Sequence, residues 1–235
     1  MNKFTYWAEE DDGSQRERFL NSIESFDQLL ISYLCLEPHA FLHAGIMLQK
    51  HQASFENKKV LSIGLDICKE VILLKANPQR ITVIDTDKPA IDCAQSLANK
   101  IVKDQKIEYV VGDARDFNIK ESYYTVLLSQ MDYCLADEAY SSLLAHFSQV
   151  GIEEVIILTP SLYEFSINPN KMIEAIEFFL GATKRMIIRG KYSSATYRRK
   201  KSYFETLISE RYEIVDHFDY KYPSGREHLY RLIKR

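Results

Sequence analysis

Runs of apolar, β-branched residues that stop abruptly on small or acidic residues recur in the middle of the chain. Three of them stand in a fixed order: VLSIGLDICKE (60–70), ITVIDTD (81–87) and YVVGDARD (109–116). Buried strands of a parallel sheet show this pattern when their carboxyl ends open onto a ligand crevice. We therefore expect three neighbouring strand ends to carry the chemistry of this protein.

From Lys59 onward, strand patterns alternate with helical ones. The expected strands are 59–64, 80–85, 107–112, 122–128 and 153–158, and the expected helices are 66–76, 88–103 and 137–149. Such alternation predicts right-handed βαβ units and a parallel sheet. Two terminal strand patterns, 212–220 and 227–235, flank a Pro-Ser-Gly turn signal and predict an antiparallel hairpin. The predicted fold class is α/β: a Rossmann-like, seven-stranded, mostly parallel sheet with helices on both faces and this hairpin at its C-terminal end.

The remaining segments are expected to be mainly helical. Apolar residues recur at helical spacing over 16–34, and Pro38 suits the first turn of a helix from His39 to about Gln52. After Pro160 the pattern predicts a helix around 169–180, a strand-like stretch at 185–190 and a helix around 196–209. We expect a helical N-terminal cap or lid, residues 1–56, followed by one sheet domain, residues 57–235.

Charge and composition restrict the partners. A net charge of −3 makes nucleic acid a less expected partner than a small molecule. The four cysteines contain no C-x-x-C pair, so neither a zinc site nor a disulfide framework is expected. The N-terminus has no signal-like apolar region and no run of eighteen apolar residues occurs, which predicts a cytoplasmic protein with no membrane partner. The oligomeric state is left open.

The strand-end motifs resemble those of class I S-adenosylmethionine-dependent methyltransferases over roughly residues 57–235. In that family, an acidic residue and spaced glycines follow the first strand and receive the methionine end of the cofactor. An acid at the end of the second strand binds both ribose hydroxyls, and an Asp after the third strand meets the adenine amino group. The resemblance implies S-adenosyl-L-methionine as the cofactor.

Two of the three family features are intact in this chain. Asp85 closes ITVID and corresponds to the ribose-binding acid, and Asp113 in VGDARDF corresponds to the adenine-reading Asp. The cofactor-binding residues that the resemblance implies are Gly64, Leu65, Asp66, Asp85, Thr86, Asp113, Ala114, Ser129 and Gln130.

The glycine-rich first loop departs from the family pattern. Ser62 stands at the acidic position, Gly64 is kept, and Asp66 and Cys68 replace the next two glycines. One interpretation is that Asp66 replaces the missing acid and binds the methionine ammonium; the other is a fold that persists without cofactor. A nicotinamide dinucleotide is disfavoured, because Asp66 would place a negative charge against its pyrophosphate. A sulfonium cation tolerates that charge.

Catalytic candidates follow the fourth strand. Asp132 and Tyr133 could orient an acceptor there, or could simply lead into the next helix. Methyl transfer from sulfonium requires positioning more than covalent chemistry, and a base only for a protonated nucleophile. His39 remains a candidate base; it shares a helix face with His43, but no third ligand is spaced for a metal.

Substrate-binding candidates lie in two other segments. Tyr6 and Trp7 could belong to a lid or could anchor on the core. Arg198 and Arg199 belong to a stretch, 184–201, with eight Lys or Arg residues and no acid. That stretch is either a solvated face or a binding edge for an anionic substrate.

Three functions remain open from the sequence. The leading hypothesis is a methyltransferase that acts on a small metabolite, for which an anionic group would suit the basic stretch. A looser likeness to nicotianamine-synthase-like enzymes, in VIDTDKPAIDCAQSLANK and the terminal YPSG…RLIKR, implies transfer of the aminocarboxypropyl arm instead. The altered first loop also fits a catalytically inactive, methyltransferase-like binding protein.

Overall fold

The computed structural model of the chain contains two compact units, residues 1–127 and 128–235. It describes residues 22–25, 27–29, 31, 38–65, 67–102, 106–117, 123–129, 131–132, 135–160, 162–163, 199–222 and 225–235. The division into units does not coincide with the predicted boundary between residues 56 and 57. The cap of residues 1–56 therefore stays a prediction.

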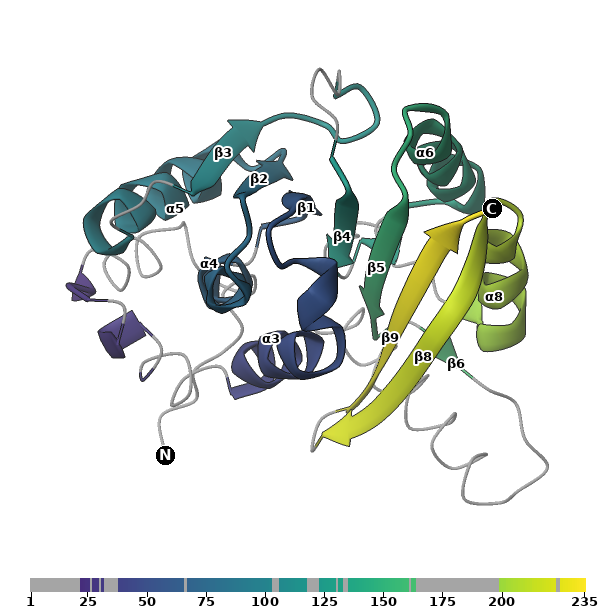
Figure 1. Ribbon diagram of the computed structural model, residues 1–235, viewed down its shortest axis with the longest axis horizontal. Coiled ribbons are helices and arrows are strands. Elements are labelled where there is room, and N and C mark those ends of the chain that lie inside the picture. Colours follow the sequence, from purple (N-terminus) through teal and green to yellow (C-terminus); the bar gives the residue numbers. More distant parts are fainter. Residues whose placement is uncertain are drawn as a thin grey trace, which may run out of the picture. The chain divides into compact units, whose positions relative to one another are not determined.

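The main sheet has the strand order β3-β2-β1-β4-β5-β9-β8 (Figure 1). Its strands are β1 (Lys59–Ile63), β2 (Arg80–Asp85), β3 (Ile107–Val111), β4 (Thr125–Ser129), β5 (Glu154–Thr159), β8 (Tyr212–Tyr222) and β9 (Gly225–Lys234). β1 pairs with β2 and β2 with β3 in parallel, whereas β9 runs antiparallel to both β5 and β8. The predicted mixed sheet with a C-terminal antiparallel hairpin is confirmed.

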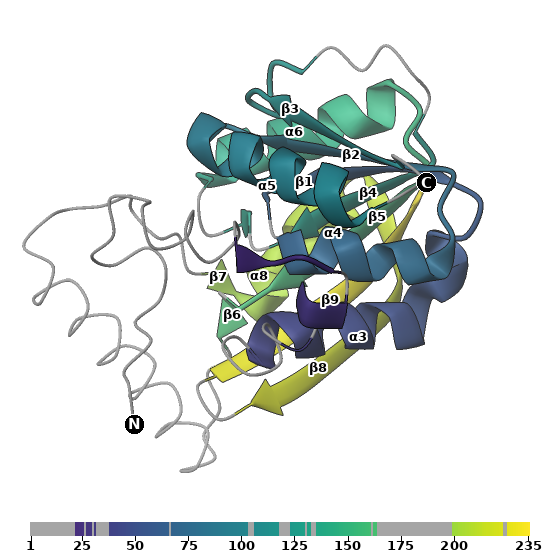
Figure 2. The same cartoon turned by 90° about the vertical axis from the view of Figure 1, so that its left-hand side faces the viewer.

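Three helices of the first unit are α3 (Pro38–His51), α4 (Ile67–Leu73) and α5 (Lys88–Ile101), with short 3-10 turns at Gln52–Ser54 and Leu74–Ala76. α3 lies against α4, and α5 lies against β3 (Figure 2). Asp87 caps α5, because its side chain accepts a hydrogen bond from the Ala90 amide at 2.9 Å. The helix expected over 66–76 ends at the predicted position: its last 3-10 turn stops at Ala76, and Asn77, which follows, has a left-handed backbone with φ of 53°.

The second unit combines helices α6 (Asp137–Gln149) and α8 (Lys201–Ser209) with the C-terminal hairpin. α8 lies against α6 and β8. The phenyl ring of Phe204 in α8 packs between two buried tyrosine rings, 5.8 Å from Tyr140 and 5.7 Å from Tyr230. This aromatic row anchors α8 to the hairpin and to α6.

The predicted helix over 196–209 is wrong at its start. Arg199 and Lys200 form strand β7, which pairs in parallel with β6 (Leu162–Tyr163), and the helix begins at Lys201. Arg199 leaves the helical pattern because its side chain is buried in a polar network described below. The predicted elements at 169–180 and 185–190 lie outside the described residues.

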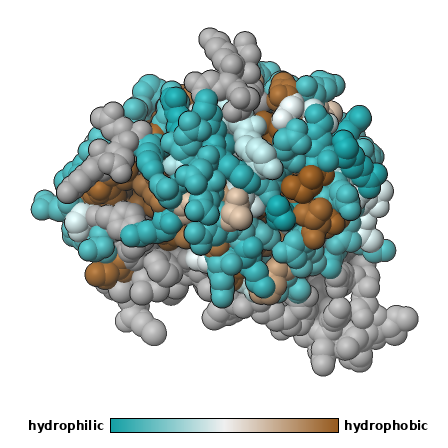
Figure 3. Space-filling model, in the orientation of Figure 1, coloured by the Kyte–Doolittle hydropathy of each residue, from teal (hydrophilic) through white to brown (hydrophobic). Residues whose placement is uncertain are grey.

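Hydrophilic side chains cover much of the face seen in Figure 3, and hydrophobic ones appear there in separate small groups. Within the described ranges, no helix is long and apolar enough to cross a membrane.

Candidate functional site

Strand ends of the first unit bring together several of the residues that the sequence singles out. Gly64 directly follows β1 and has a φ of 83°, a conformation that glycine adopts at little cost. Its amide donates to the Ile84 carbonyl at 3.0 Å, and the next amide, of Leu65, donates to the Asp85 carboxylate at 2.7 Å. The first loop is therefore tied to the end of β2 by two successive backbone amides.

The Asp85 carboxylate is fixed in orientation. Oδ2 accepts the hydrogen bond from the Leu65 amide, and Oδ1 accepts one from the Asp87 amide at 2.9 Å. A carboxylate has about four acceptor positions, so with respect to the described residues each oxygen keeps one for a further donor. Two adjacent free acceptor positions match two adjacent hydroxyl groups, such as those of a ribose. Asp85 is half-buried, so its side chain is both supported and accessible.

Asp113 lies two residues after the end of β3, in a turn that is bonded to the end of β2. The Gly112 amide donates to the Asp85 carbonyl at 2.9 Å, which fixes the turn that carries Asp113. The Asp113 carboxylate accepts hydrogen bonds from the Arg115 amide and from Arg115 Nε, each at 2.9 Å, and also pairs with Arg115 Nη2. We call Gly64, Leu65, Asp85 and Asp113 the strand-end cluster.

The Arg115 contact keeps Asp113 ionised. The hydrogen bond from the Arg115 side chain lowers the pKa of the Asp113 carboxyl, and this outweighs the opposite effect of partial burial. The Arg115 side chain is 53% exposed, so solvent screens the pair and the guanidinium can move away at little cost. Asp113 is thus an anion whose present partner can be exchanged for another hydrogen-bond donor.

Other predicted site residues are placed less completely. Thr86 is exposed beside Asp85, Ala114 is half-buried beside Asp113, and Ser129 ends β4. Asp66, Gln130, Tyr133, Tyr6, Trp7 and Arg198 lie outside the described residues, as does the side chain of His39. Their roles stay predictions.

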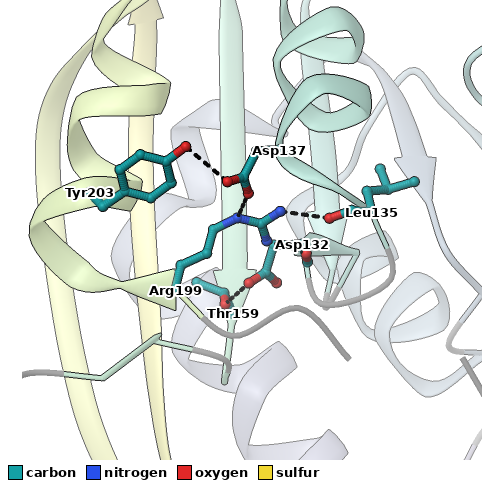
Figure 4. Close-up of polar contacts among 6 residues, drawn as sticks. All are labelled: Asp132, Leu135, Asp137, Thr159, Arg199 and Tyr203. Carbon is teal, nitrogen blue, oxygen red and sulfur yellow. Dashed lines mark hydrogen bonds and ion pairs between the residues drawn. The ribbon is translucent and has the colours of Figure 1, made fainter. Parts of the chain in front are cut away.

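A second polar cluster occupies the second unit and is drawn in Figure 4. Arg199 is 3% exposed, and its guanidinium donates to the Asp137 carboxylate at 2.7 Å and to the Leu135 carbonyl at 2.6 Å. Its third nitrogen donates to the Asp132 carbonyl. One side chain from β7 therefore holds two points of the segment between β4 and α6 and also the first residue of α6. We call Arg199, Asp132, Asp137, Thr159 and Tyr203 the Arg199 cluster.

The catalytic candidate Asp132 belongs to this cluster. Its side chain is buried, and Oδ2 accepts a 2.5 Å hydrogen bond from the Thr159 hydroxyl at the end of β5. The Tyr140 ring lies close to the Arg199 cluster: the guanidinium carbon of Arg199 is 5.5 Å from the centre of the ring. Burial first, and then the negative charge of Asp132, raise the pKa of the Tyr140 phenol, while Arg199 acts in the opposite direction. The structure thus places Asp132 and Arg199, predicted separately, in direct contact.

Asp137 lies on the exposed side of the Arg199 cluster. It accepts hydrogen bonds from Arg199 Nε and, at 2.8 Å, from the Tyr203 hydroxyl. Partial burial raises the pKa of the Asp137 carboxyl, but the hydrogen bonds from Tyr203 and Arg199 outweigh it, so the pKa is lowered overall. The same bond to Asp137 raises the pKa of the Tyr203 phenol.

The lowered pKa of Asp137 predicts an acid-dependent loss of stability. Because the pKa falls on folding, the contribution is present above the ordinary value of 3.8 and is lost as the pH falls through the lower, folded value. We expect the melting temperature of Asp137→Asn to depend less on pH than that of the wild type between pH 5 and 2. Glu138→Gln, an exposed neighbour on α6, is the matched control. If the melting temperatures of Asp137→Asn and wild type fall by the same amount between pH 5 and 2, this prediction is contradicted.

The sequence interpretation missed several members of these clusters. The sequence pattern places Asp137 only at a helix start and Tyr203 only in a helix, and Thr159 falls just past the predicted strand 153–158. Lys69 and Glu70, treated only as helix residues, form a buried ion pair next to the first loop. No local pattern of the sequence marks these side chains as members of a polar cluster, although a charge that becomes buried requires a partner. Among the described residues, no group of His, Cys, Asp and Glu could hold a metal ion.

Comparisons with known proteins bear on the fold. No protein-family model matches the chain, and no curated protein matches its sequence. Solved structures match over nearly the whole chain. One is the magnesium protoporphyrin IX methyltransferase of Synechocystis PCC 6803 with bound SAH, at 10% identity and a TM-score of 0.63, covering 95% of this chain and 94% of that chain.

A second match is the N-methyltransferase NodS of Bradyrhizobium japonicum WM9 in complex with S-adenosyl-L-homocysteine. It is 15% identical, with a TM-score of 0.62, and covers 95% of this chain and 99% of that chain. At such identities a likeness concerns the fold. The chain therefore has the Rossmann-like fold of these methyltransferases.

Proposed function

We propose that this protein is an S-adenosyl-L-methionine-dependent methyltransferase that acts on a small metabolite. The observation that carries the proposal is the Asp85 carboxylate, held at the end of β2 with one free acceptor position on each oxygen. An adenosyl cofactor presents two neighbouring ribose hydroxyls, which are the donors that this carboxylate lacks. The fold of the two neighbours solved with SAH supports the same cofactor.

The strand-end cluster would hold the cofactor by its parts. Asp85 would accept from the ribose hydroxyls, Asp113 would accept from the adenine amino group, and Gly64 and Leu65 would line the methionine end. When bound, the cofactor supplies an electrophilic methyl group on a sulfonium centre. Asp85 and Asp113 would contact only the adenosine part of the ligand, which a nicotinamide dinucleotide also contains. The choice of an adenosyl sulfonium cofactor is therefore supported by the fold of the neighbours solved with SAH.

The Arg199 cluster would serve the acceptor side of the reaction. In-line methyl transfer depends on holding the acceptor still, so a rigid segment after β4 is useful to it. Arg199 and Thr159 fix the backbone and side chain of Asp132. The guanidinium of Arg199 is already neutralised by Asp137. We therefore assign Arg199 to positioning this segment, and leave recognition of an anionic group to the rest of the basic stretch.

Calorimetry with S-adenosylhomocysteine tests the cofactor assignment. Saturable binding with one ligand per chain is expected for the purified full-length protein. Incubation with S-adenosylmethionine and pools of small metabolites should then yield S-adenosylhomocysteine by mass spectrometry. Formation of methylthioadenosine would instead indicate transfer of the aminocarboxypropyl arm. Absence of binding for both adenosyl compounds would overturn the proposal and favour an inactive binding protein.

Arg115 is expected to compete with the cofactor for Asp113. Replacing it by Met removes the competing guanidinium, and an exposed ion pair contributes about 0–1 kcal/mol. Affinity for S-adenosylhomocysteine should therefore rise by up to about fivefold, since 1.4 kcal/mol corresponds to a factor of ten. The gain should shrink at high salt, where the pair is already screened. A loss of affinity would mean that Arg115 contacts the cofactor itself.

A further inference from the structure

A buried ion pair lies behind the first loop. Lys69 and Glu70 stand side by side in α4, with side chains 2% and 0% exposed, and Lys69 Nζ lies 3.0 Å from Glu70 Oε1. Lys69 Nζ also donates to the Gly64 carbonyl at 2.9 Å. The Lys69 ammonium therefore links the Glu70 carboxylate to the backbone of the loop that follows β1.

The carboxylate of this pair meets β1 at Ser62. The Ser62 hydroxyl donates to Glu70 Oε1 at 3.0 Å, and Ser62 is fully buried. Ser62 is the position at which the methyltransferase family carries an acid. We propose that Glu70 supplies from α4 the carboxylate that this chain lacks at position 62, and that Lys69 and Glu70 together position the first loop for the cofactor. This inference rests on the proposed function.

The energetics favour a functional role for the pair. Removing two charges from water is expensive, and well-packed apolar side chains at such positions are often equally or more stabilising. Glu70 accepts a hydrogen bond from Ser62, and Lys69 donates one to the Gly64 carbonyl. Apolar side chains at positions 69 and 70 could form neither bond. These two hydrogen bonds hold β1 at the Ser62 side chain and the loop that follows it at the Gly64 backbone.

The negative charge of Glu70 also affects a tyrosine on β3. Ser62 is in register with Val83 on β2, and Val83 with Tyr109 on β3. Burial first, and then the negative charge of Glu70, raise the pKa of the Tyr109 phenol. The Glu70 charge therefore affects a side chain that is in register with position 62 across the sheet, as a carboxylate at position 62 would.

Restoring the family acid separates this proposal from a simple loss of the motif. In Ser62→Asp, two carboxylates would stand within hydrogen-bond distance of each other, and one of them must take up a proton or move. We expect Ser62→Asp to weaken binding of S-adenosylhomocysteine by about tenfold or more, because like charges this close repel strongly in a buried site. Glu70→Gln should weaken binding by a similar factor, since the carboxylate is lost.

The double variant Ser62→Asp/Glu70→Gln should bind within about threefold of wild type, because one carboxylate is again present and the two effects are coupled. Melting temperatures measured alongside report folding. Ser96→Asp, which adds a carboxylate on an exposed position of α5, is the control and should bind normally. If Ser62→Asp alone does not fold, recovery of folding and binding in the double variant supports the proposal.

Two outcomes would overturn it. In one, Ser62→Asp binds S-adenosylhomocysteine as tightly as wild type or more tightly. In the other, the double variant does not recover, as when the two losses of affinity simply add. A wild-type protein that binds no S-adenosylhomocysteine would instead overturn the proposed function, and this inference with it. The failure of the inference alone is recognised by normal wild-type binding.

Discussion

Substitution of Asp85 by Ala is expected to abolish most of the affinity for S-adenosylhomocysteine. Hydrogen bonds to a charged group contribute about 1.5–3 kcal/mol each, so losing two ribose contacts should cost at least about 100-fold in affinity. The substitution also releases the Leu65 amide, which holds the first loop against β2, and the Asp87 amide in the turn that follows β2. Calorimetric titration of S-adenosylhomocysteine into the variant measures the loss.

Two further variants make this result specific. Asp85→Asn keeps the size of the side chain but replaces one acceptor oxygen by a donor, so an intermediate loss is expected. Asp92→Asn removes an exposed carboxylate from α5 in the same unit, where it pairs with Lys88, and should bind as wild type does. An Asp85→Ala protein that is folded and binds with undiminished affinity would contradict the placement of the ribose.

The strand ends could be predicted because their signal is local. A β-branched run that stops on Gly64 or Asp85 reports the strand, its end and the acid within one short segment. The structure confirms that β2 lies between β1 and β3, so these ends are neighbours. The resemblance added the role of each acid, which no periodicity could have supplied.

The buried charges could not be predicted because their partners are distant in the sequence. Arg199 contacts Asp132 and Asp137 across more than sixty positions, and nothing near Arg199 in the chain indicates its burial. Its neighbours in a basic stretch suggested a solvated or ligand-binding face. Glu70 and Ser62 are only eight positions apart, but a change from strand to helix lies between them. In each case tertiary contacts override the local pattern.

Substitution of Arg199 by Met is expected to destabilise the protein substantially. The variant would leave the Asp132 and Leu135 carbonyls without this donor and would remove the cation that balances Asp137. Removing one partner of a buried charge network costs about 3–5 kcal/mol, and the partial exposure of Asp137 reduces this to about 2–4 kcal/mol. For a chain of this length, the melting temperature should fall by about 4–16 °C.

Arg199→Lys separates stability from positioning. Lysine keeps the charge, but it lacks the planar fork that reaches Asp132, Leu135 and Asp137 together. We expect Arg199→Lys to fold, to bind S-adenosylhomocysteine as wild type does, and to turn over an identified acceptor more slowly, because the segment after β4 is less rigidly held. Arg211→Met, at an exposed arginine in the same unit, is the control. Turnover by Arg199→Lys equal to that of wild type would restrict the Arg199 cluster to a role in stability, because the segment would then position the acceptor without its three anchoring bonds.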